Sequence, residues 1–572
     1  MAKRKAQGIV VRKDAAGGSS GSKKKSEASA VAVDPVATTT EEAEPARPLR
    51  KKKKQAKRPT TGEKKQGGFD LVEAVSSATA GVAVDGRNAV GEPPAWVPLE
   101  KHAEQLTATE VLAWLLWPVT PSQFFSEYWE KRPLHVRRGR PAHLSSLFSK
   151  ADIDQHLANG VEFKYGERIN LARFDSVTKR KVDLNSGPRG AVAARSDIVS
   201  AWAGGATMQV MHPQQFHDQV WRLLAGLERA FGAVFGANSY LTPNENQGLA
   251  PHFDDVEVFM LQLEGSKRWR LHAPPAGEEH PLPRDYSRDF LPEELGELLL
   301  DCILDPGDLL YLPRGTVHSG VAIAKEGNHT CTFSHHLTVS TYQKTAWCHL
   351  LERVLPAALE KAASQHVEFR AGLPVGFLGY MGTWHDGISE GEAAAGRAGF
   401  MRRFKSLLRS LLDYVDADEV CDELGVDFMS LRMPPCCGDA GNVACVASAS
   451  TATGDGPDEI LKAKLLGARL RWLEPSAIRA MISTDPDTSE PTVIIFHAHA
   501  NSRKQHMCQS MELEDVVGCL RFDAAMFLPA IKKLISAGTE FVRCSDLPLR
   551  DDDDKVSFVD HLREAGLVDL RS

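Results

Sequence analysis

Two histidines and an aspartate, far apart along the chain, have the residue types and spacing of a metal site. His252 and Asp254 stand two residues apart in HFDDVEVFMLQL, and residues two apart in a strand project to the same face. His318 lies near the end of DPGDLLYLPRGTVHSG, whose turn residues and apolar run predict a strand, a tight turn and a returning strand. Two imidazoles and one carboxylate on one side of a metal are typical of non-haem Fe(II) oxygenases and leave three coordination positions open. The spacing therefore predicts that these residues hold Fe(II), with room for a bidentate 2-oxo acid and for dioxygen.

A 2-oxo acid with a second carboxylate needs a cation inside the same pocket, because burying an unpaired charge is costly. The segment LQLEGSKRWRLH supplies two adjacent candidates, Lys267 and Arg268, at the start of the strand that follows the His-x-Asp segment. Successive side chains of a strand point to opposite faces, so one of the two turns inward. Alternation alone does not decide between them.

The neighbouring acidic and histidine residues fit a metal site less well. Asp255 follows Asp254 directly and is expected on the opposite face of the strand. The adjacent pair His335 and His336 is also expected to point to opposite faces, and His497 and His499 have no third ligand near them in the sequence. We interpret these four histidines as surface or core residues.

The elements around the candidate ligands are predominantly short strands. NSYLT, HFDDVEVFMLQL, KRWRLHA, DCILDPGDLLYLP and HTCTFSHHLTV are β-rich runs separated by Gly, Pro and Asn, and closely spaced strands of this kind predict a barrel or sandwich. Helices are expected before this region, at 107–117, after Thr120 and from Pro213 to Phe235, with an end at Gly236. Helical periodicity returns after Tyr342, and a mixture of helices with one clear strand, PTVIIFHAHA, follows residue 458.

The N-terminal segment has a different composition. Residues 1–69 contain 18 Lys and Arg against 7 Asp and Glu, whereas the whole chain of 572 residues has a net charge of −7. No aromatic residue occurs before Phe69, so this arm is expected to be disordered, and its three clusters of Lys and Arg favour nuclear or nucleolar targeting or contact with nucleic acid. No stretch approaches the ~18 consecutive apolar residues that a membrane span needs, and the ten cysteines include no CxxC pair, so we expect reduced thiols and no zinc site.

Several of these segments together resemble the JmjC ribosomal oxygenases, in particular the nucleolar branch described as bifunctional histidyl hydroxylases and histone lysine demethylases. The resemblance is carried by FFSEYWEKRPLHV, NSYLTPNENQGLAPHFDDVEVFMLQLEGSKRWRLH, PGDLLYLPRGTVHSG and SHHLTVSTYQ, which cover most of residues 95–345. It implies an α+β multidomain protein with a double-stranded β-helix (cupin/JmjC) barrel, a helical dimerisation domain and a C-terminal winged helix. The boundaries expected are 1–92 for a disordered basic arm, 93–341 for the oxygenase domain, 342–433 for the helical domain, 434–457 for a linker and 458–572 for a winged-helix-like domain.

The resemblance also implies roles for individual residues. His252, Asp254 and His318 match the family's iron ligands, and Lys267 rather than Arg268 matches the lysine that pairs with the 2-oxoglutarate carboxylate. Further residues fall where family members line the cofactor and substrate pocket: Asn238, Tyr240 and Ser334. One departure is Gln209, which stands where the family often has an arginine, and another is the acidic run Asp551–Asp554 in the expected winged helix, where DNA contact would favour basic residues.

The expected activity is a 2-oxoglutarate-dependent dioxygenase reaction, with Fe(II), 2-oxoglutarate and dioxygen. The resemblance favours a histidine of a large-subunit ribosomal protein as the substrate, in a homodimeric protein of the nucleolus and nucleoplasm. An alternative is a histone lysine demethylase that acts on histone tails in transcription repression. A non-catalytic chromatin or ribosome-assembly adaptor is the alternative of another class, and three converging ligands with a buried cation argue against it.

Overall fold

The computed structural model describes most of the chain after residue 107 and one short segment before it. All described residues fall in one compact unit, Glu73–Ser572. No helix among them is both long enough and apolar enough to cross a membrane. The expected basic arm lies largely outside the described residues, as does nearly all of the expected linker at 434–457. The described residues are 80–87, 94, 108–277, 281–324, 331–387, 390–435, 459–485, 488–507 and 518–571.

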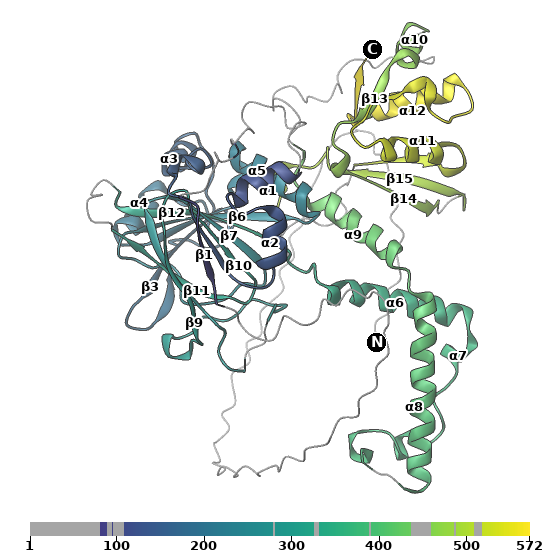
Figure 1. Ribbon diagram of the computed structural model, residues 1–572, viewed down its shortest axis with the longest axis horizontal. Helices are drawn as coiled ribbons and strands as arrows, with labels where there is room; N and C mark the ends of the chain where they lie inside the picture. The colour runs from purple at the N-terminus through teal and green to yellow at the C-terminus, as the bar shows by residue number, and fades with distance from the viewer. Residues whose placement is uncertain are drawn as a thin grey trace, which may run out of the picture. The chain divides into compact units, whose positions relative to one another are not determined.

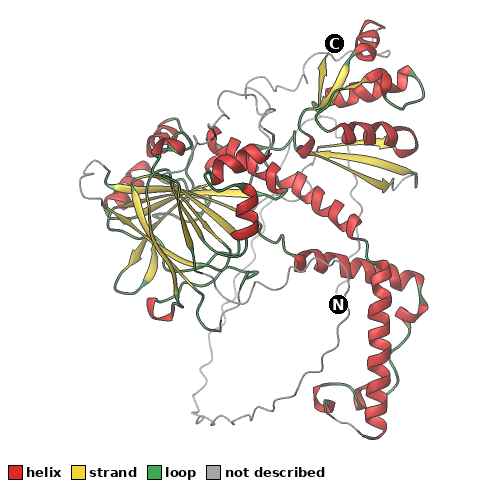
Figure 2. Ribbon diagram, in the orientation of Figure 1, coloured by secondary structure: helices red, strands yellow, loops and turns green. Residues whose placement is uncertain are grey.

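Two sheets form the oxygenase domain (Figures 1 and 2). The larger has nine strands in the order β1-β2-β10-β7-β12-β6-β5-β3-β4, and the smaller has three in the order β11-β8-β9. This arrangement confirms the expectation of a β-rich barrel. The strands are β1 (Val82–Asp85), β2 (Leu134–Arg137), β3 (Ile169–Asp175), β4 (Arg180–Asp183), β5 (Thr207–Met211), β6 (Phe235–Pro243), β7 (Glu257–Glu264), β8 (Ser266–His272), β9 (Leu298–Leu304), β10 (Leu309–Leu312), β11 (Val317–Ile323) and β12 (Phe333–Thr341).

Strand β1 corrects the expected extent of the N-terminal arm. Residues up to 92 were expected to be disordered, yet Val82–Asp85 pairs in parallel with Leu134–Arg137. The alternation of Val82 and Val84 with smaller or polar residues lets both valines pack against the core of the barrel. A segment of four residues is too short to reveal itself by composition, so only its pairing with β2 identifies it as a strand.

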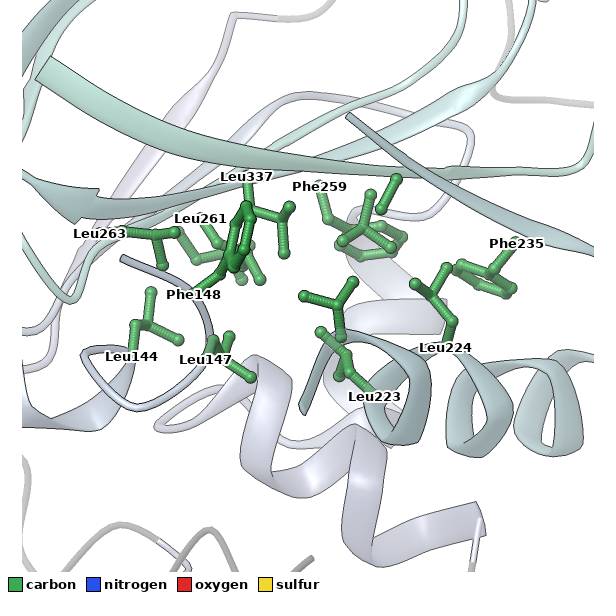
Figure 3. Close-up of a cluster of buried hydrophobic side chains, with 14 of the residues drawn as sticks. Leu144, Leu147, Phe148, Leu223, Leu224, Phe235, Phe259, Leu261, Leu263 and Leu337 are labelled. Atoms are coloured by element: carbon green, nitrogen blue, oxygen red, sulfur yellow. The ribbon is translucent and has the colours of Figure 1, made fainter. Parts of the chain in front are cut away.

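Helices cover the outer face of the larger sheet and bury it. Figure 3 shows Leu223 and Leu224 of one helix directed toward Phe259 and Leu261 of β7. The alternate residues of β7, Val258 and Met260, belong to a second apolar cluster inside the barrel, so this strand is buried on both faces. The covering helices are α1 (Ala108–Leu116), α2 (Pro121–Glu127), α3 (Lys150–Ala158), α4 (Arg195–Ala203) and α5 (Asp218–Phe231).

Capping residues determine where two of these helices begin or end. The Thr120 side chain accepts a hydrogen bond from the Gln123 N–H, which confirms the expected start of α2. The helix expected from Pro213 to Phe235 is shorter in the structure. It ends at Gly232, whose φ of 63° is the left-handed conformation that glycine adopts readily, and Phe235 then begins β6.

The residues after the barrel form a helical unit. It contains α6 (Trp347–Gln365), α7 (Val367–Arg370), α8 (Gly391–Leu411) and α9 (Ala417–Leu431). One side of α6 buries Val354, Ala358 and Ala362. The unit agrees with the helical periodicity expected after Tyr342.

The C-terminal residues form two small sheets with helices, which agrees with the expected mixture of helix and strand. One clear strand was expected here, and the residues that the structure describes in this region contain six. The segment EILKAKLLGARLRW is helical only to Gly467, after which Arg469–Trp472 is a strand. The elements are α10 (Glu459–Gly467), β13 (Arg469–Trp472), β14 (Ile478–Thr484), β15 (Pro491–His497), β16 (Gly518–Asp523), α11 (Ala524–Ala537), β17 (Val542–Arg543), α12 (Asp552–Glu564) and β18 (Val568–Arg571).

The acidic run in this unit has a structural explanation. Asp551 is the N-cap of α12 and its side chain accepts a hydrogen bond from the Asp554 N–H. Carboxylates in the first turn of a helix are stabilised by its exposed N–H groups and by the helix dipole. Asp551–Asp554 therefore start a helix.

Candidate metal centre

The three candidate ligands meet in the structure. One ligand atom from each of His252, Asp254 and His318 lies within 4.8 Å of the other two, and no other cluster of this kind occurs in the part of the chain that the structure describes. The Nε2 atom of His252 is 3.9 Å from Asp254 Oδ1, and Nε2 of His318 is 3.8 Å from Asp254 Oδ2. The spacing suits three donors around one ion.

Backbone pairing, rather than a continuous strand, brings the two histidines together. We expected His252 and Asp254 within a strand, but β7 begins only at Glu257. His252 instead forms an isolated antiparallel bridge with His318, in which the His318 N–H donates to the His252 carbonyl at 2.9 Å. The Gly315 N–H donates to the Asp254 carbonyl at 3.0 Å. This hydrogen bond holds the turn before β11 against the residue that supplies the carboxylate ligand.

Hydrogen bonds orient both imidazoles for metal binding, and burial acts on His318. Nδ1 of His252 lies 2.8 Å from the Ala250 carbonyl, and Nδ1 of His318 lies 3.1 Å from the Thr316 carbonyl. Because a carbonyl only accepts, each Nδ1 carries the proton and each Nε2 keeps a lone pair. Burial, and to a smaller extent the neighbouring His252, lowers the pKa of His318 to about 4. His318 is therefore suited to act as a neutral ligand, and in both residues Nε2 is the ring nitrogen that faces the carboxylate of Asp254.

Lys267 lies inside the barrel, as the resemblance implied. Its side chain is 5% exposed, its Nζ lies 4.8 Å from the centre of the Trp269 ring, and no ion pair to it occurs among the described residues. Burial lowers its pKa to about 7. Arg268 points outward and pairs with Asp301 at 2.6 Å. A buried cation without a counter-ion fits the distal carboxylate of 2-oxoglutarate.

The extended side chain of Lys267 depends on a small residue opposite it. Gly320 of β11 faces this part of β8, and a Cβ atom there would lie 2.8 Å from Lys267 Cε and from the Trp269 ring. Glycine at this position therefore leaves the lysine room to reach the cavity.

One cavity of about 70 Å³ contains the triad and Lys267. A larger cavity of about 1260 Å³, bordered by α6 and α9, includes none of these residues. The volume of a cavity therefore does not by itself identify the metal site. The small cavity lies between the two sheets of the barrel. Its lining is Thr207, Tyr240, Gly248, Leu249, Ala250, His252, Asp254, Met260, Lys267, Trp269, His318, Ser319, Gly320, His336 and Thr338.

The remaining expected pocket residues take three different positions. Tyr240 lines the cavity, and burial together with the nearby Asp254 raises the pKa of its phenol, so it stays protonated. Asn238 lies two residues before it on β6 and outside the lining of the cavity. Ser334 is outside the cavity lining, and its hydroxyl accepts a hydrogen bond from Gln262 Nε2 at 2.9 Å. Asp255, as expected, points elsewhere and accepts from Gln343.

His336 lines the cavity, although the sequence indicated only a surface or core role for it. His336 stacks on the Tyr240 ring, with centroids 5.1 Å apart and planes 7° apart, and its ring is nearly perpendicular to that of Trp269. Its neighbour His335 points to the other side, where Ser239 and Glu264 hydrogen-bond it. The two histidines do point to opposite faces, and both are buried. His336 and Thr338 are two residues apart on β12, so both side chains project to the same face of the strand. This alternation is the sequence feature that could have placed His336 in the cavity.

The fold and the site define a JmjC-type 2-oxoglutarate oxygenase. Residues 209–345 match the family model described as "JmjC domain". The chain is 32% identical to the protein named Ribosomal oxygenase 1 of Homo sapiens over 520 residues, covering 86% of this chain and 74% of that protein. It is 30% identical over 471 residues to a protein of Branchiostoma floridae named "Bifunctional lysine-specific demethylase and histidyl-hydroxylase NO66", covering 81% and 67% of the two chains.

The chain belongs to the ribosomal oxygenase family. A solved structure of the Escherichia coli ribosomal oxygenase YcfD with cobalt and 2-oxoglutarate covers 80% of this chain and 99% of its own, at 15% identity and a TM-score of 0.39. The protein is an enzyme that uses iron, 2-oxoglutarate and dioxygen. When bound, these groups supply the oxidising power for C–H hydroxylation, while the chain orients the reactants and excludes water.

Proposed function

We propose that this protein hydroxylates a histidine side chain of a large-subunit ribosomal protein, with iron held by His252, Asp254 and His318. The observation that carries the proposal is that one cavity contains both the triad and a buried lysine with no counter-ion among the described residues. Lys267 would pair with the distal carboxylate of 2-oxoglutarate. The names of the relatives supply the substrate class.

The polarity of the cavity favours a neutral substrate group. Of the described residues that line it, Asp254 and Lys267 carry charge, and in this proposal each already has a partner. The Tyr240 hydroxyl can donate a hydrogen bond, and Oδ1 of Asn238 beside it is a buried acceptor without a partner. An imidazole offers one acceptor nitrogen and one N–H donor, which complements this pair. A methylated ammonium offers no acceptor and would enter beside the Lys267 cation.

Mass spectrometry of peptides after reaction tests the substrate. The full chain, with Fe(II), 2-oxoglutarate and dioxygen, is incubated with histidine-containing peptides of large-subunit ribosomal proteins and with methylated histone peptides. We expect a gain of one oxygen atom on a histidine, and no such gain in a matched peptide with alanine in its place. Loss of a methyl group from a histone peptide, with no oxidised histidine, would instead identify a lysine demethylase.

We also propose that the helical domain, residues 342–433, forms a homodimer. Leu351, Leu355 and Leu359 recur every four residues on α6 and are 48%, 42% and 51% exposed. An apolar stripe of this kind on a helix needs a partner surface. A two-fold dimer would bury it on both copies.

Charges placed in this stripe should separate the dimer. The double substitution Leu355→Glu and Leu359→Glu removes roughly 1.5–3 kcal/mol of burial per leucine and occurs on both copies. We expect the mass in solution, measured by light scattering, to fall from that of a dimer to that of a monomer. Glu360→Gln, on an exposed neighbouring position, is the matched control. A dimer that survives both glutamates would place the contact elsewhere.

The remaining parts of the chain have proposed roles as well. We propose that residues 458–572 form a winged-helix-like domain. Its helices support this reading, since α11 packs on β15 and β16 and α12 packs on β18. We further propose that the basic clusters within residues 1–92 direct the protein to the nucleus and nucleolus, with contact to nucleic acid as a second role.

A further inference from the structure

A row of side-chain amides crosses the sheet and ends at the Tyr240 hydroxyl. Asn185 Nδ2 donates to Asn170 Oδ1 at 3.3 Å, Asn170 Nδ2 donates to Gln209 Oε1 at 3.2 Å, and Gln209 Nε2 donates to Tyr240 Oη at 2.9 Å. Asn170 is directly opposite Gln209 in the pairing of β3 with β5, and Gln209 is directly opposite Tyr240 in the pairing of β5 with β6. Directly opposed residues share one face of a sheet, so these side chains meet in a line. We call these three amides the amide relay.

The direction of every hydrogen bond in the relay is fixed from its far end. The Leu171 backbone N–H donates to Asn185 Oδ1 at 2.9 Å. A backbone N–H can only donate, so Asn185 must present its oxygen to Leu171 and its NH₂ group to Asn170. Each following amide is then oriented in turn, oxygen toward the previous residue and nitrogen toward the next. The last link reaches Tyr240, whose oxygen must accept.

This polarity determines where the Tyr240 proton points. The hydroxyl oxygen accepts from Gln209, so the hydroxyl proton cannot point at that amide and is directed away from it. Tyr240 lines the metal cavity, and no acceptor for its proton is found among the described residues. The O–H is therefore directed at whatever enters the cavity.

We propose that Asn185, Asn170 and Gln209 are positioning residues that fix Tyr240 as a hydrogen-bond donor, so that the enzyme selects a substrate group with an acceptor atom. The inference rests on the proposed function, in which that atom is the unprotonated ring nitrogen of histidine. A group that only donates, such as a methylated ammonium, would leave the Tyr240 proton unpaired. Leaving such a group unsatisfied in a buried site is unfavourable.

An isosteric substitution separates this role from simple packing. In Gln209→Glu, one carboxylate oxygen still accepts from Asn170, and the other accepts the proton of Tyr240. Every hydrogen bond of the relay is kept, yet the phenol no longer donates into the cavity. If the relay only holds the strands together, this variant should behave as the wild type does.

A substitution at Asn185, the member of the amide relay farthest from Tyr240, should also turn the Tyr240 proton away from the cavity. Asn185→Asp keeps the acceptor for the Leu171 N–H but presents a second oxygen to Asn170, whose amide must then turn over. The turn passes through Gln209 to Tyr240, which again donates into the relay. Asp183→Asn is the matched control, because Asp183 accepts from the Asn185 backbone N–H at 2.9 Å and its replacement retains an acceptor oxygen.

The test measures kcat and KM of the full-length variants on the histidine peptide that the wild type oxidises. We expect Gln209→Glu and Asn185→Asp to raise the KM for the peptide roughly 10- to 100-fold, with the KM for 2-oxoglutarate unchanged and with Asp183→Asn equal to the wild type. Equal peptide KM in Gln209→Glu and the wild type overturns the inference, and so does an effect of Gln209→Glu that Asn185→Asp does not share. Failure of the wild type to oxidise any histidine peptide, with methyl groups removed from histone peptides instead, overturns the proposed function and this inference with it.

Discussion

His318→Ala should abolish metal-dependent turnover of 2-oxoglutarate. The substitution removes one of three ligand atoms that lie within 4.8 Å of one another. Losing even an outer partner of a metal ligand typically costs 10–100-fold in affinity or activity, so loss of a ligand should cost at least roughly 100-fold. Iron affinity, measured by titration, and succinate formation should fall together. A chelator added to the wild type should reproduce the loss, and excess Fe(II) should reverse it in the wild type alone.

A neighbouring carboxylate provides the control for the triad. Asp255→Asn changes the same charge one residue from Asp254, but Asp255 faces away and accepts a hydrogen bond from Gln343. We expect this variant to retain iron affinity and turnover within about twofold, because no ligand atom is lost. If Asp255→Asn abolished iron binding while Asp254→Asn spared it, the assignment of the third ligand would be wrong.

Lys267→Ala should cause the second large loss, in the binding of 2-oxoglutarate rather than of iron. The alanine would leave the distal carboxylate buried without a cation, and removal of one partner of a buried ion pair costs about 3–5 kcal/mol. That range corresponds to roughly a 100-fold or greater rise in the KM for 2-oxoglutarate. Iron affinity should stay close to the wild-type value, since Lys267 is not one of the three converging ligands.

Arg268→Ala is the matched control, because this cation is next in the sequence yet pairs with Asp301 on the outer face.

The pH dependence of 2-oxoglutarate binding gives an independent check on the role of Lys267. Burial lowers the pKa of Lys267 to about 7 in the empty pocket, so the ammonium is lost as pH rises above that value. A bound carboxylate raises this pKa again, and the affinity for 2-oxoglutarate should therefore fall above pH ~7 by at most tenfold per unit. A pH-independent KM in the wild type, with a normal KM in Lys267→Ala, would assign the carboxylate to another residue.

The candidate ligands could be predicted from the sequence because their chemistry depends on residue types in order. A His-x-Asp segment, a Gly-Asp turn and a later histidine within a β-rich region indicate a metal site without knowledge of the contacts. The same reasoning placed His252 and Asp254 in a strand, which was wrong. The two residues share a direction because His252 pairs with His318 in an isolated bridge. That pairing joins segments distant in sequence, so local patterns do not contain it.

Residue types and periodicity by themselves determined the oxygenase class, the barrel, the helical unit after it and the inward position of a cation at 267 or 268. The family resemblance then favoured Lys267 over Arg268. Tertiary structure alone decided that this lysine has no counter-ion among the described residues, that His336 stacks on Tyr240, and that three amides orient a phenol. The physical reason is that alternation and turn chemistry act between neighbours in the chain. Burial, pKa shifts and the directions of side-chain hydrogen bonds depend on contacts between strands. These contacts form only when β3, β5, β6 and β12 lie side by side in the sheet.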